Sequence, residues 1–257
     1  MSTVLVEIKD VIGTIRLAGP RGNAMSDALI QDLSSALRTV GGASSVKAVL
    51  LASAHPKIFC PGLDLVSLSA FNRVDLTSFM LHFSTVLTDL FALKKPVVAA
   101  VNGAAVAGGC LLALTADWRV TKHGAPMGLN EVKVGVPLPW SAVMLLRAAV
   151  PAFSQTAVAL LGRNFEGAAA VAAGLAHETA DEEGFEAIVA ERLAEFADKD
   201  AYAFGVTKGH LRGPAVASMR DHEREFLGEF LDGWFSDDTQ ARIHKTVAAL
   251  RSKAQIA

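Results

Sequence analysis

The sequence from Pro96 to Ala116 is PVVAAVNGAAVAGGCLLALTA. Its first part, Pro96–Asn102, is short, apolar and β-branched, which predicts a buried strand. Its last part, Gly109–Ala116, has the length and apolar character of a buried helix. Gly108 and Gly109 therefore lie where a strand ends and a helix begins, and unpaired backbone N–H groups point outward there. Such a terminus can hold a phosphate, a carboxylate or an oxyanion. Taken alone, two glycines favour the simpler interpretation of a tight turn with close helix–strand packing.

The same order of strand, glycine loop and helix occurs earlier in the chain. Val46–Ala52 is another buried apolar strand, and the loop KIFCPGLDL, residues Lys57–Leu65, leads to a helix that begins near Asp64. Asp is a good N-cap residue there. Each copy has a backbone N–H at the junction of loop and helix, that of Leu63 in the first and that of Gly108 in the second. Two donors from separate loops can converge on one oxygen, and that geometry defines an oxyanion hole.

A candidate base follows in the glycine- and proline-punctuated segment from Met127 to Pro137. Glu131 lies there among apolar neighbours such as Leu129, Val132 and Val134. A carboxylate in such company either turns to solvent or lies in a pocket that raises its pKa and prepares it to accept a proton. Without further context, the sequence pattern favours the solvent-exposed alternative. Asp117, in contrast, is interpreted as a hydrogen-bonded structural carboxylate.

The remaining segments predict an α/β protein. Two strands, Val4–Lys9 and Val11–Leu17, form a hairpin that turns near Asp10. The other predicted elements are a helix capped by Ser26 and ending near Val40, a helix over Asp75–Leu93, a strand over Trp118–Lys122, and helices over Leu138–Val150 and Phe153–Leu161.

From Glu182 onward the pattern is helical, up to a last helix over Asp238–Lys253. Gly205–Gly213 predicts a joint between a core of residues 1–200 and a C-terminal helical region of residues 201–257. An aromatic stripe at Phe226–Phe235 predicts packing against something large, either the core of the same chain or a neighbouring subunit.

Composition excludes several classes of protein. The chain has 257 residues, 51% of them hydrophobic and 19% charged, which is enough for a sizeable core. A net charge of −2 argues against nucleic acid as a partner, and no segment is apolar enough for a membrane span. The start MSTVLVEIKD lacks the layout of a signal peptide. Cys60 and Cys110 fall in glycine-containing loops without metal-ligand spacing, and the seven histidines are scattered. We expect a soluble cytoplasmic protein with neither a disulfide framework nor a metal.

Three motifs resemble those of the crotonase (enoyl-CoA hydratase/isomerase) superfamily: Phe59–Leu65 (FCPGLDL), Asn102–Cys110 (NGAAVAGGC) and Gly128–Gly135 (GLNEVKVG). The resemblance implies a spiral of ββα turns with a C-terminal helical region that forms a homotrimer or a dimer of trimers. It implies that the N–H groups of Leu63 and Gly108 hold the thioester oxygen of an acyl-CoA, with no cofactor beyond the CoA of the substrate. The residues implied in substrate binding are Lys57, Pro61, Gly62, Asp64, Leu65 and Leu111.

Hydratases of this superfamily add water with two glutamates, and only one of them has a counterpart here. Glu131 is retained, whereas Leu111 stands at the other position. The resemblance is strongest to 3,2-trans-enoyl-CoA isomerases, so it implies that Glu131 moves a proton from the α to the γ carbon of a 3-enoyl-CoA. The alternatives are hydration, thioester hydrolysis, or acyl-CoA binding without catalysis. A cysteine nucleophile is a further idea, but small buried cysteines are the simpler interpretation.

Overall fold

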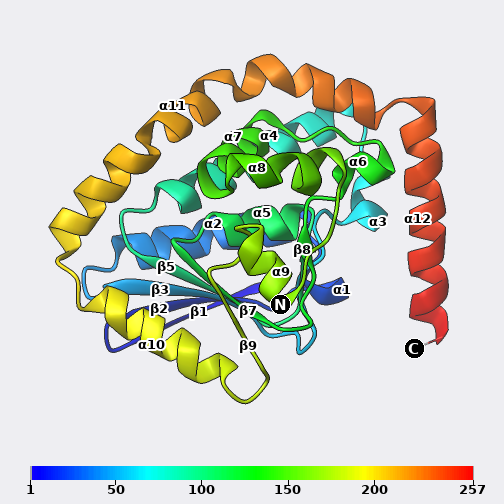
Figure 1. Cartoon of the computed structure of the whole chain (residues 1–257). Coiled ribbons are helices and arrows are strands. Elements are labelled where there is room, and N and C mark those ends of the chain that lie inside the picture. The colour runs from blue at the N-terminus through cyan, green and yellow to red at the C-terminus, as the bar shows by residue number, and fades with distance from the viewer. Residues whose placement is uncertain (1, 257) are drawn as a thin grey trace.

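A six-stranded sheet runs through the structure, a computed structural model that describes residues 2–256 (Figure 1). The sheet order is β1-β2-β3-β5-β7-β9. The first two strands form the predicted antiparallel hairpin, and every later neighbour is parallel. The strands are β1 (Val4–Lys9), β2 (Ile12–Leu17), β3 (Ala48–Ser53), β5 (Val97–Val101), β7 (Trp118–Lys122) and β9 (Glu178–Ala180).

Three short strands build a second parallel sheet in the order β4-β6-β8. They are β4 (Ile58–Cys60), β6 (Ala104–Val106) and β8 (Met127–Gly128). Each follows a strand of the large sheet and precedes a helix, so the chain repeats a ββα turn three times. This is the ββα spiral that the resemblance implies. Cys60 thus ends a strand and Cys110 lies in a helix, so their prediction as loop residues is wrong; both are buried free thiols.

Helices cover both faces of the large sheet. The main hydrophobic core lies between the sheet and the helices on one face, and a smaller apolar cluster lies under α10 on the other (Figure 1). Ser26 caps its helix as predicted, accepting a hydrogen bond from the N–H of Leu29 at 3.3 Å. The helices before the C-terminal region are α1 (Pro20–Asn23), α2 (Asp27–Gly42), α3 (Leu65–Leu68), α4 (Arg73–Ala92), α5 (Gly108–Leu114), α6 (Glu131–Val134), α7 (Trp140–Ala149), α8 (Ala152–Gln155), the π-helical turn η1 (Thr156–Leu160), α9 (Gly167–Ala172) and α10 (Phe185–Ala197).

The predicted joint at Gly205–Gly213 is wrong. One helix, α11 (Ala201–Trp234), runs through it for 34 residues and lies across α4 and α7. Gly205 serves close packing there, because a Cβ on it would lie 3.2 Å from the carbonyl oxygen of Lys94. The division of the chain into residues 1–200 and 201–257 stays a prediction.

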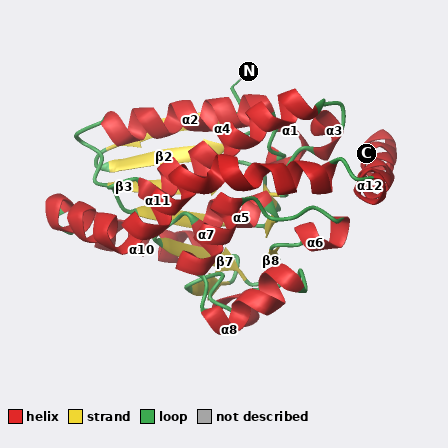
Figure 2. Ribbon diagram, turned by 90° about the horizontal axis from the view of Figure 1, so that it is seen from above, coloured by secondary structure: helices red, strands yellow, loops and turns green. Residues whose placement is uncertain are grey.

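The aromatic stripe on α11 belongs to the core of its own chain. Leu227, Phe230, Leu231 and Trp234 are all buried within the single chain. The stripe therefore gives no support to a subunit interface. The last helix, α12 (Asp237–Ile256), stands at one end of the molecule next to α3 and α6, as Figure 2 shows from above.

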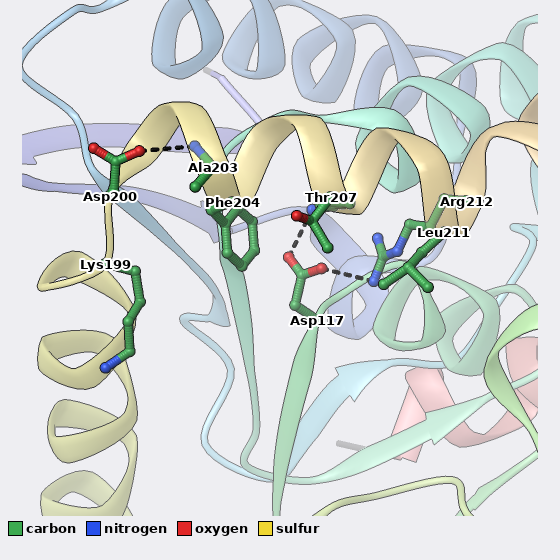
Figure 3. Close-up of a pocket in the computed structure, with 9 residues that line it drawn as sticks. Asp117, Lys199, Asp200, Ala203, Phe204, Thr207, Leu211 and Arg212 are labelled. Carbon is green, nitrogen blue, oxygen red and sulfur yellow. Dashed lines mark hydrogen bonds and ion pairs between the residues drawn. The ribbon is translucent and has the colours of Figure 1, made fainter.

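Asp117 is the structural carboxylate that the sequence predicts. Its Oδ2 accepts hydrogen bonds from the backbone N–H of Val97 at 2.8 Å and from the Lys208 ammonium at 2.6 Å. Its Oδ1 pairs with the Arg212 guanidinium at 2.8 Å (Figure 3). Asp117 thereby fixes α11 to the start of β7. Arg212 also donates to the carbonyl oxygens of Phe91 and Thr115, at the C-terminal ends of α4 and α5.

Candidate active site

A cavity of about 750 Å³ opens where α4, α5, α6, α11 and α12 meet, a size typical of small-molecule sites. Its wall is mainly apolar. The lining residues are Arg21, Ala24, Ile58, Pro61, Leu63, Asp64, Leu65, Val66, Met80, Phe83, Ala107, Gly108, Leu111, Asn130, Glu131, Val134, Val136, Pro137, Pro139, Phe230, Trp234, Thr246, Leu250 and Arg251. The ionisable residues in this lining are two carboxylates, Asp64 and Glu131, and two arginines, Arg21 and Arg251. The rest of the wall has the apolar character that suits a hydrocarbon chain.

The first glycine loop is fixed by a parallel bridge between Met25 and Leu63. The Met25 N–H donates to the carbonyl of Gly62 at 2.8 Å, and the Asp64 N–H donates to the carbonyl of Met25 at 3.1 Å. The C=O and N–H of a trans peptide point in opposite directions. Because the Gly62 carbonyl faces Met25, the N–H of Leu63 faces away from it.

The second glycine loop touches the first. A Cβ on Gly62 would lie 2.8 Å from Ala107 Cβ and 3.1 Å from Gly108 N, so only glycine allows this approach. Gly62 also has a φ of +94°, and Ala107 adopts the unusual combination φ 50°, ψ −130° just before α5 begins. Among the hydrogen bonds of residues 2–256, none has the N–H of Leu63 or Gly108 as its donor. Both residues line the cavity, so the structure brings two loop–helix junctions to one place.

Glu131 lies in the pocket, so the solvent-exposed alternative that the sequence pattern favours is wrong. It begins α6, and its Oε2 is buried without a hydrogen-bond partner among the described residues. Burial raises the pKa of this carboxyl from 4.5 to about 7. Leu111 is buried and lines the same cavity, so the position offers no second acid or base. A hydrogen bond of 2.8 Å from the Ala107 N–H to the Gly128 carbonyl links the second glycine loop to the segment that carries Glu131.

The structure brings most of the predicted substrate-binding residues to the cavity wall. Pro61, Leu65 and Leu111 line it. Asp64 lines it too, as the N-cap of α3, with its side chain bonded to Ser67 and Arg21. Gly62 is buried behind the wall, between the two loops. Lys57 is exposed and outside the lining, one residue before Ile58.

Several lining residues were not predicted. They come from four parts of the chain: Met80 and Phe83 from α4, Arg21 from the turn before α2, Phe230 and Trp234 from α11, and Thr246, Leu250 and Arg251 from α12. Only the PRGN turn at residues 20–23 carries a local signal, the dipeptide Gly19-Pro20 at its start. The aromatic residues of α11 are recognisable as a buried stripe, but their partner is set by tertiary packing.

A second hollow of about 500 Å³ lies between Asp117 and the first turns of α11 (Figure 3). Its wall includes Lys199, Asp200, Lys208 and Arg212. Asp117 holds Lys208 and Arg212, and Asp200 caps α11 through the N–H of Ala203. These contacts attach the first turns of α11 to the rest of the protein, and this structural role accounts for the charged residues around the hollow. Residues 2–256 contain no group of three or more His, Cys, Asp or Glu side chains arranged to hold a metal, and no helix among them is long and apolar enough to cross a membrane.

Comparison with known proteins identifies the class. The family described as enoyl-CoA hydratase/isomerase matches residues 7–240. The chain therefore belongs to the enoyl-CoA hydratase/isomerase family, and it is an acyl-CoA enzyme with the crotonase fold.

Relatives of known name include isomerases and hydratases. Mouse mitochondrial enoyl-CoA delta isomerase 1 is 26% identical over 255 residues, which cover 97% of this chain and 88% of the relative. Mouse mitochondrial methylglutaconyl-CoA hydratase is 34% identical over 126 residues, which cover 49% of this chain and 40% of the relative.

Solved structures share the fold over nearly the whole chain. Human mitochondrial delta3-delta2-enoyl-CoA isomerase superposes with a TM-score of 0.89 at 22% identity, covering 98% of this chain and 99% of the other. A probable enoyl-CoA hydratase from Mycobacterium tuberculosis gives 0.83 at 27% identity, covering 89% and 96%. The fold is thus common to proteins named for both reactions.

Proposed function

We propose that this enzyme isomerises 3-enoyl-CoA thioesters to 2-trans-enoyl-CoA thioesters. The observation that carries the proposal is Glu131, which lines the cavity with a buried Oε2 that has no hydrogen-bond partner among the described residues, while Leu111 occupies the other acid–base position. Similarity to enoyl-CoA delta isomerase 1 along 97% of this chain supports the same reaction.

In the proposed mechanism the Glu131 carboxylate takes a proton from C2 of the bound thioester. The electron pair of that C–H bond forms the C1–C2 double bond of a dienolate, the π electrons of the C1–O bond move onto the thioester oxygen as negative charge, and the C3–C4 double bond stays in place. The N–H groups of Leu63 and Gly108 donate to this oxygen; one such donor typically contributes about 3–4 kcal/mol to transition-state stabilisation. The Glu131 carboxylic acid then gives the proton to C4, which binds it with the electron pair of the C3–C4 double bond. The C1–C2 pair moves to C2–C3 and the carbonyl is restored, so the product has its double bond at C2–C3.

The environment of Glu131 suits both halves of this proton shuttle. A pKa of about 7 lets the group accept a proton at neutral pH and give it back without a large energetic penalty. The apolar side chain of Leu111 keeps water from the reacting carbons. The proposed reaction is a proton transfer, so it requires no cofactor apart from the CoA of the substrate.

A substrate panel tests the proposal. With 3-enoyl-CoA and 2-enoyl-CoA substrates of increasing chain length, we expect conversion of the former to 2-enoyl-CoA and only slow hydration of the latter. Absorbance of the conjugated enoyl thioester, combined with chromatography of the products, measures both reactions. Rapid hydration of 2-enoyl-CoA without any isomerisation would contradict the proposal and favour the hydratase alternative. Release of free CoA would favour the hydrolase alternative.

We also propose that the enzyme assembles as a homotrimer or as a dimer of trimers. The resemblance to the crotonase superfamily supports this assembly, and exposed apolar side chains on α8 and at the end of η1, Phe153, Leu160 and Leu161, offer a surface that a neighbouring subunit can cover. Light scattering at micromolar concentration should return three or six times the mass of one chain. A mass equal to one chain would contradict the proposal.

A further inference from the structure

The four-residue element α1 (Pro20–Asn23), the turn before α2, has a strained backbone, and its Arg21 lines the cavity. Arg21, Gly22 and Asn23 have φ values of 52°, 67° and 69°, three consecutive left-handed residues of which two are not glycine. Such conformations are uncommon for residues with a side chain and persist only where the surroundings impose them. At Gly22, a Cβ would lie 2.7 Å from the Ile58 side chain, so the turn packs tightly on β4.

Asn23 imposes this conformation. Its buried amide donates to Ser53 Oγ at 2.8 Å and to the carbonyl of Phe59 at 2.9 Å, and its Oδ1 accepts from the N–H of Gly19 at 2.8 Å. Ser53 ends β3, Phe59 lies in β4, and Gly19 follows β2. The turn is therefore anchored to the frame of the protein, and Arg21 leaves it in a fixed direction.

Arg21 ends on the loop that carries Leu63. Its guanidinium pairs with Asp64 Oδ2 and donates to Ser67 Oγ at 3.1 Å. The Asp64 side chain is 1% exposed and that of Arg21 48%. The Asp64 carboxylate also accepts from Ser67 Oγ at 2.6 Å and from the Ser67 N–H at 3.3 Å, which ties the start of α3 to the same pair.

Residues 21–25 thus hold the loop of residues 62–64 at three points. Two are the backbone hydrogen bonds of Met25 to Gly62 and Asp64, on either side of Leu63. The third is the ion pair between Arg21 and Asp64. Without the third, the Asp64 carboxylate and the first turn of α3 lose their side-chain link to Arg21, only the two backbone hydrogen bonds remain, and the peptide groups around Leu63 gain freedom to rotate.

We propose that Arg21 is a positioning residue that acts through Asp64 to hold the Leu63 N–H toward the substrate oxygen. This inference rests on the proposed role of that N–H in catalysis. Arg21 does not touch the reacting carbons in this scheme. Loss of Arg21 misaligns the Leu63 N–H, which stabilises the transition state more than it stabilises the bound substrate. The loss therefore lowers kcat more than it weakens substrate binding.

The test compares Arg21→Met with a matched control, Arg73→Met, which removes an arginine from an exposed ion pair with Asp232. We expect Arg21→Met to lower kcat for 3-enoyl-CoA by about 10- to 100-fold, less than the complete loss of an oxyanion donor, with KM changed by no more than about threefold. Arg21→Lys should restore part of kcat, and Arg73→Met should leave kcat unchanged.

A spectroscopic measurement separates positioning from simple destabilisation. Infrared spectra of a bound saturated acyl-CoA, with ¹³C at the thioester carbon, report hydrogen bonding to the carbonyl through its stretching frequency. In the wild type the carbonyl stretching frequency should be lower than that of the same ligand in water. In Arg21→Met it should rise part of the way toward the value in water. The double variant Arg21→Met/Asp64→Asn leaves no unpaired charge at position 64 and keeps an Asn cap for α3. It should still show the lowered kcat and the raised carbonyl frequency of Arg21→Met.

Two outcomes would overturn the inference. One is recovery of kcat and of the carbonyl frequency in the double variant, which would mean that only an unpaired buried Asp64 harms the single variant. The other is a tenfold or larger rise in KM with unchanged kcat and carbonyl frequency, which would mean that Arg21 contacts the CoA directly. Because the spectra use an unreactive ligand, a wild type that shifts the carbonyl but fails to isomerise contradicts the proposed reaction, and the Arg21→Met spectrum still decides the role of Arg21.

Discussion

Replacing Glu131 by Gln lowers the rate of 3-to-2 isomerisation by at least about 10²-fold, because the amide keeps the shape of the side chain but accepts no proton. Acyl-CoA binding survives the change, since the cavity wall is otherwise intact. Stopped-flow kinetics and calorimetric binding on the same preparation measure the two effects. An exposed carboxylate elsewhere provides the control, and Glu183→Gln should leave the rate unchanged.

The pH profile adds a signature to the same prediction. Burial places the pKa of the Glu131 carboxyl at about 7, and the group works as a base only when it is ionised. The wild-type kcat/KM should therefore fall about tenfold per unit below pH 7, whereas the residual activity of Glu131→Gln should lack this dependence. Isomerisation that persists undiminished in Glu131→Gln would show that another group is the base.

Replacing Gly109 by Ala should damage both stability and catalysis. The added Cβ would lie 1.9 Å from the carbonyl oxygen of Cys60 and 2.6 Å from its carbonyl carbon, so α5 has to move away from β4. Overpacking of this kind typically costs about 1–3 kcal/mol of unfolding free energy and occasionally more. The clash is with backbone rather than with a flexible side chain, so we expect a cost at the upper end. The movement also carries Gly108 away from Leu63.

Gly209→Ala is the matched control for Gly109→Ala. Gly209 is an exposed position inside α11 where an added Cβ meets no atom within 4 Å. Alanine there should raise the unfolding free energy by about 0.5–1 kcal/mol through its better helix propensity. Urea unfolding curves of both variants, recorded together with kcat, test the pair. A Gly109→Ala protein as stable and as active as the wild type would mean that the contact between α5 and β4 is not required.

The sequence predicts the large sheet better than the small one. The hairpin and strand β7 were predicted with their correct bounds or nearly so, because each has five or six residues and a clear apolar pattern. Strands β4, β6 and β8 have two or three residues each and lie beside glycines, so no alternation can show in the sequence. They exist because neighbouring segments pair, which is a tertiary effect.

The candidate site divides in the same way. Leu63, Gly108 and Glu131 lie in contiguous motifs and Leu111 directly follows one of them, so the resemblance points to all four. The sequence alone does not predict the role proposed for Arg21, because that role depends on a left-handed turn and on a carboxylate 43 positions away. The glycines at Gly205–Gly213 misled for a related reason: one of them serves close packing inside a long helix rather than a break in it.

Helix α5 is fastened at the end opposite the cavity. Arg212 donates to the Thr115 carbonyl at 2.9 Å and Arg119 to the Ala116 carbonyl at 3.1 Å, about 10 Å along the axis from Gly108. In water, a carbonyl oxygen that gains negative charge must wait for surrounding dipoles to turn toward it, and this reorientation is part of the barrier. Because α5 is held at its C-terminal end before substrate binds, its backbone N–H dipoles need little reorientation when the charge develops. In the proposed reaction, much of the solvent reorganisation is thereby replaced by an arrangement that was completed during folding.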